Sequence, residues 1–126
     1  TSLKKKVKFG KNVLIGKNVK IGKNCLIGHN TIIEKNVIIG SNCSISSGVQ
    51  IYTHDTVKWA TSGGKENYEY SSTKIGNNCY IGPNTIITKG VSLGEGCIVG
   101  ANSLVTNSFE AGSKIAGSPA KMIGNT

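Results

Sequence analysis

Several features that would place this chain in a common protein class are scarce or missing. Its 126 residues include only two Pro against seventeen Gly, a balance that fits neither collagen nor a Pro-rich disordered segment. No apolar run approaches the ~20 residues needed to cross a bilayer, and no signal peptide is visible. The length favours a single domain. The chain begins at Thr1 without a Met, which leaves open that further sequence precedes it.

Residues that bind metals or stack on nucleic-acid bases are also few. Aromatic residues make up 6% of the chain, too few for the stacking platform of single-stranded nucleic-acid binders, so we expect no nucleic-acid partner. The four Cys show no CxxC or Cys/His ligand spacing; we expect no metal and a reduced, cytoplasmic setting. The formal net charge of +9 favours an anionic partner, such as a phosphorylated cofactor or an acidic glycan.

What the sequence does contain is a six-residue repeat. One bulky aliphatic or aromatic residue recurs every six positions, nine times from Leu3 to Ile51 and six times from Ile75 to Val105. The next position is usually Gly, the fourth is Asn or Gly from Asn12 to Gly48 and again from Asn78 to Asn102, and the fifth is small or β-branched. This spacing violates the 3.6-residue period of a helix, and Asn and Gly tolerate the positive φ of a turn. We therefore expect positions 1 and 5 to point inward, with all four Cys at position 5 acting as small buried residues.

A second period indicates a triangular coil. Four of the residues that replace Gly at position 2 are Glu34, Tyr52, Thr88 and Thr106, at spacings of 18, 36 and 18. Ser46 also replaces Gly and does not fit this series. Since each turn of the coil contains three hexads, fifteen hexads form about five coils. We therefore expect an all-β fold, a parallel β-helix with triangular coils.

The repeat breaks between Ile51 and Ile75, a distance of 24 residues, which is one hexad plus 18. The only Trp, the only Asp, three of the four Tyr and one of the two His fall in this window. Because the phase is kept, we interpret the break as a loop inserted at one corner of the coil. The expected organisation is a single domain with first coils at 1–56, the inserted loop at 57–74, last coils at 75–110 and a C-terminal cap at 111–126.

The hexads, the segment "IYTHD" with its aromatic, polar loop, and "IAGSPAKMIG" at 115–124 together resemble the hexapeptide-repeat acyltransferases, a left-handed parallel β-helix family, and in particular its sugar O-acetyltransferases. The likeness covers nearly the whole chain. It implies a homotrimer with sites between subunits, acetyl-CoA as co-substrate and a chain that leaves the β-helix into a short C-terminal helix. For that helix, Ser118 is a plausible N-cap, and Pro119 suits the first helical turn.

In that family a loop His is the general base, which implies this role for His54. Without the resemblance, His54 would occupy the turn position of the repeat, where His is tolerated. Asp55 is adjacent along an extended chain and points away, so Glu66, Glu69 or a backbone carbonyl is the expected partner that orients His54. His29 lies at an outward position and is interpreted as a surface residue.

The resemblance also implies residues around the acceptor and CoA. Tyr52, Asp55, Trp59 and Tyr80 are candidates for acceptor binding, although the aromatic residues of the loop, with Tyr68 and Tyr70, suit packing equally well. Small and basic residues match the CoA site: Gly82, Gly100, Ala101, Lys114, Ala116, Gly117 and Lys121. Gly82 and Gly100 are equally explained as repeat glycines. Pro83 has no N–H to hold a thioester oxygen, and Asn107 replaces a basic residue that is typical of the family.

Several alternatives remain at this stage. The first hypothesis is acetyl transfer to a sugar hydroxyl in surface-polysaccharide or lipopolysaccharide biosynthesis; the second is N-acetylation of an amino-sugar nucleotide. A γ-class carbonic anhydrase needs three His for its metal, and this chain has two. A non-enzymatic β-helix scaffold would predict an uninterrupted repeat. Lysines at position 3 of several hexads fit a solvated face or, alternatively, a site for a negatively charged glycan or nucleotide sugar: Lys11, Lys17, Lys23 and Lys35.

Overall fold

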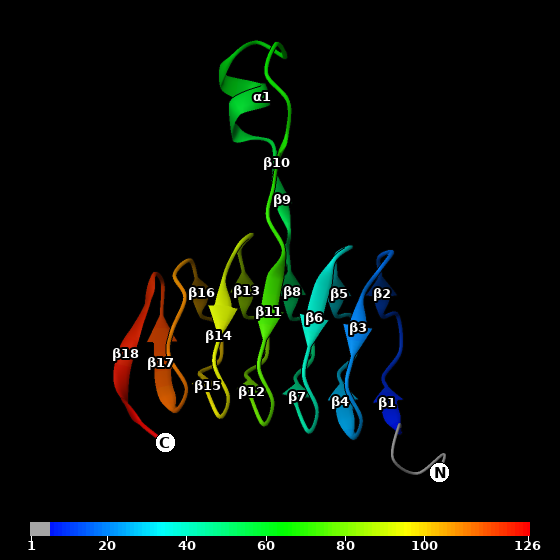
Figure 1. Cartoon of the computed structure of the whole chain (residues 1–126), viewed down its shortest axis with the longest axis vertical. Coiled ribbons are helices and arrows are strands. Elements are labelled where there is room, and N and C mark those ends of the chain that lie inside the picture. Colours follow the sequence, from blue (N-terminus) through cyan, green and yellow to red (C-terminus); the bar gives the residue numbers. More distant parts are fainter. Residues whose placement is uncertain (1–5) are drawn as a thin grey trace.

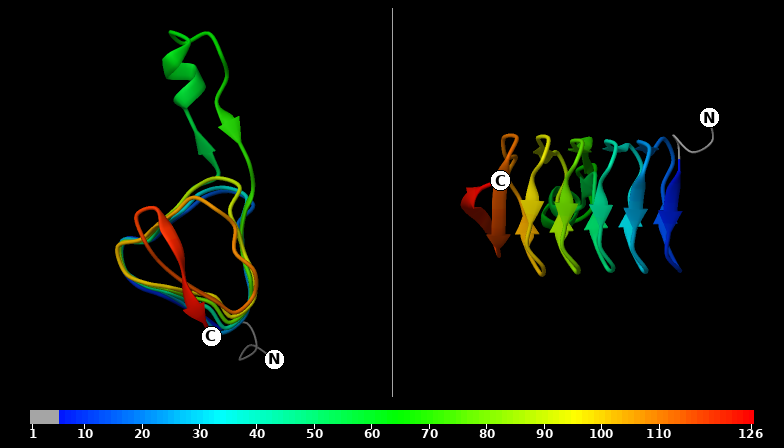
Figure 2. Two further views of the ribbon diagram at one scale, coloured as in Figure 1. Left: turned by 90° about the vertical axis from the view of Figure 1, so that its left-hand side faces the viewer. Right: turned by 90° about the horizontal axis from the view of Figure 1, so that it is seen from below.

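The computed structural model describes residues 6–126; Leu3 and the lysines at positions 4 and 5 lie outside this range. Within it the chain winds into a solenoid of stacked coils with a triangular cross-section (Figures 1 and 2). Three parallel sheets form its three faces, and the chain visits them in strict rotation. The predicted all-β parallel β-helix is confirmed.

The strands are short, because each occupies one side of the triangle. The first face contains β1 (Val7–Phe9), β4 (Cys25–Ile27), β7 (Ser44–Ile45), β12 (Tyr80–Ile81), β15 (Ile98–Val99), β17 (Ser113–Gly117) and β18 (Ala120–Asn125). The second face contains β2 (Leu14–Ile15), β5 (Ile32–Ile33), β8 (Gln50–Ile51), β13 (Ile86–Ile87) and β16 (Leu104–Val105). The third face contains β3 (Lys20–Ile21), β6 (Val37–Ile39), β11 (Thr73–Ile75) and β14 (Ser92–Leu93). We call the corners first, second and third, where the chain passes from first to second face, from second to third, and from third back to first.

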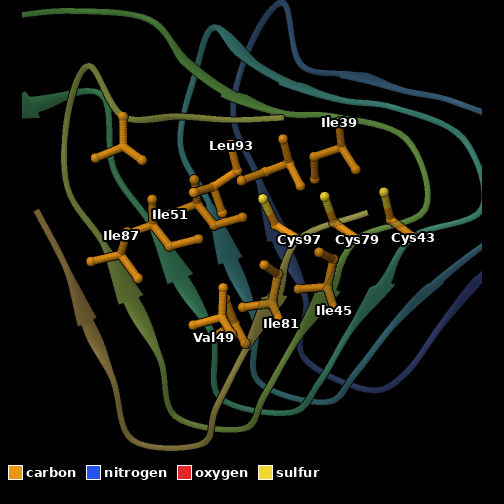
Figure 3. Close-up of a cluster of buried hydrophobic side chains, with 14 of the residues drawn as sticks. Ile39, Cys43, Ile45, Val49, Ile51, Cys79, Ile81, Ile87, Leu93 and Cys97 are labelled. Atoms are coloured by element: carbon orange, nitrogen blue, oxygen red, sulfur yellow. The ribbon is translucent and has the colours of Figure 1, made fainter. Parts of the chain in front are cut away.

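The repeat explains both corners and core. The Asn residues at position 4 adopt φ between 57° and 64°, and Gly48, Gly90 and Gly96 take the same turn. The residues at position 1 form inward ladders: Ile45 stacks on Ile81 (Figure 3), and Ile81 pairs with Val99 in the next coil. Ile51, Ile81 and Ile87 are fully buried. Burial of this kind stabilises the fold by roughly 1.5–3 kcal/mol for each large aliphatic side chain.

The four Cys form one column at the third corner, in successive coils; Figure 3 shows Cys43, Cys79 and Cys97 of this column. All four are buried free thiols. Each Sγ donates to a main-chain carbonyl of the adjacent coil, that of Gly40, Gly76, Gly94 or Glu110, at 3.1–3.2 Å. The structure therefore confirms the prediction that Cys at position 5 is a small buried residue, and adds that its weak S–H donor has a partner.

The inserted segment leaves the solenoid at the second corner, after β8, and returns in phase. It rises as a hairpin of β9 (His54–Asp55) and β10 (Glu69–Tyr70), with the short helix α1 (Val57–Thr61) at its tip (Figure 1). On return, β11 pairs with β6 and places Ile75 on Ile39. The predicted return at the next face is confirmed. The hairpin starts and ends earlier than the expected 57–74, because His54 is already in its first strand and Thr73 in the next coil.

Two predictions for the C-terminal half need correction. The first face has six parallel strands, so the solenoid begins a sixth coil beyond the expected five. The expected helix after Ser118 is wrong: β17 and β18 form an antiparallel hairpin, with a cis Ser118–Pro119 bond at its turn. Local capping signals favoured a helix, but pairing β18 along the last coil supplies partners for backbone groups at the edge of the sheet.

Candidate active site

His54 lies at the base of the hairpin, directly above the second corner. It is in β9, paired with Tyr70 of β10, and its φ is not positive. It therefore does not occupy the turn that a continued repeat would have given it. Its side chain is 29% exposed, so the ring is held by the protein but open to a ligand.

Glu34, from the preceding coil, holds the imidazole. Its two carboxylate oxygens lie 2.7 and 2.6 Å from Nδ1 of His54. A carboxylate at this distance accepts the Nδ1–H hydrogen bond, which leaves the lone pair on Nε2. Within residues 6–126, Nε2 has no hydrogen-bond partner, so it is the nitrogen that can accept a proton.

The carboxylate of Glu34 is itself fixed by Thr53. The Thr53 N–H donates to Oε1 at 2.7 Å and its hydroxyl lies 3.2 Å from the same atom. Burial raises the pKa of Glu34, but the hydrogen bonds from Thr53 and His54 and the attraction of an imidazolium outweigh it, and the net pKa is lowered. The carboxylate is thus kept ionised beside the imidazole. The predicted partners Glu66, Glu69 and a backbone carbonyl are wrong for this role.

Aromatic rings surround His54 on the hairpin side. The rings of Tyr68 and Tyr70 both stack on the imidazole, with centroids at 5.8 Å, and Trp59 meets Tyr68 edge-on at 6.4 Å. All three side chains are about half exposed. Tyr52, below them, is half-buried, and its hydroxyl donates to Gln50. The aromatic residues of the loop therefore pack on His54 and still present exposed ring surface.

Ion pairs attach the hairpin to the coil that follows it. Lys89, in that coil, lies 3.0 Å from Asp55 and 3.9 Å from Glu69, and within the hairpin Lys58 lies 3.2 Å from Glu69. The N–H of Val57 and the ammonium of Lys89 hold the pKa of Asp55 below its usual range. Asp55 therefore anchors the hairpin and points away from the imidazole, as the alternation along a strand predicts.

The residues expected at CoA lie elsewhere, at the first corner. Gly82, Gly100 and Ala116 occupy equivalent positions in three successive coils. A Cβ on Gly82 would lie 2.6 Å from the nitrogen of Ala101, and one on Gly100 would lie 3.1 Å from the Cβ of Ala116. Close packing of the coils thus explains both glycines. Four further members are exposed on the last coils or on the terminal hairpin: Ala101, Lys114, Gly117 and Lys121.

Within one chain, these two groups are not brought together. His54, Tyr52, Asp55 and Trp59 belong to the second corner and its hairpin, whereas the CoA candidates line the first corner. Tyr80 lies with the latter group, exposed on the first face, two residues before the buried Gly82. Figure 2 shows the hairpin projecting from a single corner of the triangle.

The comparisons with known proteins agree with this architecture. The model of the bacterial transferase hexapeptide family (six repeats) matches residues 6–34, 18–53 and 72–107, which together make up most of the solenoid. The chain belongs to this hexapeptide transferase family. Among curated proteins, no sequence matches.

The solved structures that match include transferases. A galactoside acetyltransferase in complex with coenzyme A is 27% identical with a TM-score of 0.64, over 94% of this chain and 64% of that one. A maltose O-acetyltransferase from Clostridium difficile is 26% identical with a TM-score of 0.61, over 96% and 67%. AntD from Bacillus cereus, an N-acyltransferase solved with dTDP and coenzyme A, is 25% identical with a TM-score of 0.58, over 94% and 83%.

Sequence reasoning on this hexapeptide transferase missed one residue of the site, Glu34. The signal was present, because Glu34 heads the column of residues that replace Gly at the second corner. Its link to His54 was not visible, since the two residues are 20 positions apart and meet only because one coil lies directly on the next. His29, in contrast, is exposed as predicted.

Two further observations bear on the chemistry of this hexapeptide transferase. In residues 6–126, no three His, Cys, Asp or Glu side chains are grouped so that they could hold a metal ion. No helix in the same range is long and apolar enough to cross a membrane.

Proposed function

We propose that the chain is a CoA-dependent acetyltransferase that acylates a hydroxyl of a sugar, with His54 as general base. The observation that carries the proposal is the Glu34–His54 pair, held at the foot of an aromatic hairpin. The galactoside and maltose acetyltransferases among the structural neighbours support both the reaction and the class of acceptor. A place in surface-polysaccharide or lipopolysaccharide biosynthesis is part of the same proposal.

The chemistry of His54 follows from its hydrogen bonds. Glu34 fixes the proton on Nδ1 and orients the ring, so Nε2 faces solvent as a base. An acceptor hydroxyl bound there loses its proton to Nε2 as its oxygen attacks the acyl carbon, and the carboxylate stabilises the imidazolium that forms. The same proton then returns to the departing sulfur. No Ser or Cys nucleophile is needed for direct transfer.

The first corner fits CoA, which would supply an activated thioester. Its column of small residues allows a narrow chain to approach the backbone, at Gly82, Gly100 and Ala116. Lys114 and Lys121 lie exposed on the last two strands, where they would meet phosphate groups. Pro83 has no N–H to offer to the thioester oxygen, so another donor must stabilise the charge that develops there.

A homotrimer would join the two corners into one site. The side chains that point outward from the second face are almost all aliphatic: Leu14, Ile32, Ile86 and Leu104, with Gln50 between them. An exposed apolar row of this kind favours association. If three copies turn this face toward a common axis, the second corner of each copy meets the first corner of the next. Such head-to-tail contacts close into a ring and place His54 beside the small-residue column of its neighbour.

An amine acceptor is the second candidate. A base that removes a proton from a hydroxyl serves equally for an amine, and AntD, an N-acyltransferase, matches over 94% of this chain. The acceptor series in the test below separates the two candidates.

The test is thiol release from acetyl-CoA with sugars, amino sugars and nucleotide sugars, for wild type and His54→Ala. We expect acetylation of one acceptor class by wild type, and a loss of about 10²-fold or more in the variant. Sedimentation equilibrium should show that both proteins are trimers. Unchanged turnover in His54→Ala would refute the role of the base, and failure of wild type to bind CoA would refute the acyltransferase function itself.

A further inference from the structure

The positive charge of this protein is concentrated at one end of the solenoid. Residues 6–35 contain seven Lys and a single carboxylate, Glu34, whereas residues 36–126 contain six Lys and five carboxylates. The seven are Lys6, Lys8, Lys11, Lys17, Lys20, Lys23 and Lys35. The hairpin and the last coils are therefore close to neutral, and the excess charge lies on the coils that precede His54.

Two of these lysines belong to the same corner as His54. Lys17 and Lys35 occupy the turn at the second corner in the two coils before Thr53, and the carbonyl of Lys17 accepts the N–H of Asn36. Because neighbouring strands lie about 4.8 Å apart, the two lysine backbones are about one coil apart. Together with Leu14, Ile32 and Glu34 they line an open groove on the N-terminal side of His54.

Lys35 is connected to the base through Tyr70. Its Nζ lies 4.4 Å from the centroid of the Tyr70 ring, and that ring stacks on His54 at 5.8 Å. A cation at this distance from a ring is attracted to its face. The Tyr70 ring thus contacts both the ammonium group of Lys35 and the imidazole of His54, whose Nε2 would accept the proton.

Neither lysine is neutralised. In the part of the chain that the structure describes, the ion pairs involve His54, Lys58 and Lys89, and not Lys17 or Lys35. Glu34, the one carboxylate in their groove, is occupied by His54 and Thr53. Lys89 at the same corner is paired with Asp55. The groove before His54 therefore carries unpaired positive charge, and the coil after it does not.

We propose that the acceptor carries a phosphate or diphosphate group, which binds Lys17 and Lys35 while the acceptor hydroxyl or amine lies at Nε2 of His54. The inference rests on the proposed acyltransferase function and narrows its acceptor to phosphorylated or nucleotide-linked sugars. Lysine binds phosphate as a point charge, and a phosphate monoester carries nearly two negative charges at neutral pH, which matches two ammonium groups. All fifteen basic residues of the chain other than His are lysines, so a carboxylate would not find the bidentate partner that Arg provides.

The phosphate takes no part in the bonds that change. The acceptor oxygen or nitrogen forms a bond to the acyl carbon, the carbon–sulfur bond breaks, and the acceptor proton passes to Nε2 and on to the thiol. Removal of one lysine should therefore weaken acceptor binding and leave the chemical step almost unchanged.

The experiment compares glucose, glucose 1-phosphate and UDP-glucose, with the corresponding galactose and glucosamine series, in wild type, Lys17→Gln and Lys35→Gln. Lys23→Gln is the matched control, because Lys23 occupies the same position of the repeat at the third corner. We expect acylation of phosphorylated acceptors with a KM that rises about tenfold in each test variant, a kcat within about threefold, and no change in Lys23→Gln. Lys17→Gln guards against an indirect effect through the hairpin, since within residues 6–126 no hydrogen bond or ion pair joins Lys17 to the hairpin. Sugar phosphates and nucleotide sugars distinguish a single phosphate from a diphosphate as the bound group.

Titration calorimetry with UDP and with inorganic pyrophosphate gives a readout that does not depend on turnover. Binding that weakens in both test variants and not in the control supports the inference, even if no acceptor in the series is acylated. Neutral sugars acylated as well as their phosphates, with unaltered KM in the variants, would overturn it and leave the acyltransferase function standing. Absence of UDP and pyrophosphate binding to wild type would also overturn it. A failure of wild type to bind CoA would contradict the proposed acyltransferase function and not the binding of phosphate by Lys17 and Lys35.

Discussion

The second and third corners of this solenoid are built from the same repeat and yet carry different chemistry. At the third corner four successive coils carry a Cys, whose buried thiol donates to a main-chain carbonyl of the adjacent coil. At the second corner, Glu34, Tyr52 and Thr88 replace Gly in successive coils, and the hairpin emerges between the last two. The comparison shows that one corner can depart from the repeat without loss of phase, because the other two corners maintain the register of every coil.

The largest expected difference between the two corners is in activity, and it is tested by removing the proposed base at the second corner. His54→Ala should lower kcat by about 10²–10⁴-fold, with the melting temperature of the β-helix little changed, because the partly exposed side chain contacts Glu34 and the hairpin and not the buried aliphatic ladder. The measurement is thiol release under saturating acetyl-CoA, with circular dichroism for stability.

His29→Ala is the control for that variant. His29 also sits at a corner, and its Nδ1 accepts the N–H of Lys11 at 2.7 Å, but it lies outside the hairpin and two coils before Gly82, the first of the small residues expected at CoA. Activity should stay within about twofold of wild type. A comparable loss in both variants would mean that the effect comes from perturbed coils and not from the base.

Substitutions in the buried ladder of aliphatic residues should lower stability, whereas His54→Ala should lower activity. Ile81→Ala removes a fully buried side chain and should lower the free energy of unfolding by about 2–5 kcal/mol. Ile98→Ala, on the outer surface of the same face and 37% exposed, should cost less than about 1 kcal/mol. Urea unfolding followed by circular dichroism measures both, and equal losses would contradict the inward and outward assignment.

The sequence determines the ladder more completely than the site. A fixed period of six assigns Ile81 inward and Ile98 outward without any structure, and the 24-residue gap predicts that Ile75 returns over Ile39. The pairing of Glu34 with His54 could not be read in the same way, because it depends on how the side chains of two adjacent coils point at one corner. The prediction of a C-terminal helix was wrong for a related reason. The pairing of β18 depends on the free edge of the last coil, and the local capping signals at Ser118 and Pro119 contain no information about that edge.

Glu34→Gln tests the positioning of the base and should have a smaller effect than loss of His54. An amide keeps the shape but not the charge that stabilises the imidazolium, so we expect kcat to fall by about tenfold or somewhat more. The measurement is thiol release at saturating acetyl-CoA. Glu95→Gln, which replaces a carboxylate at an exposed corner position, is the control. An unchanged kcat in Glu34→Gln would refute the positioning role of Glu34.

The same carboxylate makes stability depend on pH. The pKa of Glu34 is lower in the folded chain than its ordinary value, so its contribution to folding is present above the unfolded pKa and is lost as the pH falls through the folded value. Wild type should therefore be more stable than Glu34→Gln near pH 7, and the difference should shrink below about pH 4.5. Thermal unfolding between pH 3 and 7 checks this, and a difference that grows on acidification would contradict it.

The smallest expected effect concerns the turns that the two corners share. Asn42, at the third corner, has φ of 61°, a region that costs a residue with an ordinary Cβ about 1–2 kcal/mol. Asn42→Ala should destabilise the chain by about 1 kcal/mol, whereas Asn42→Gly should be close to neutral, since glycine adopts this conformation freely. Both variants should keep full turnover, because the third corner takes no part in the proposed site. If Asn42→Ala lowered turnover, the third corner would be coupled to the second. The second corner could then not hold His54 independently of the turns elsewhere in the coil.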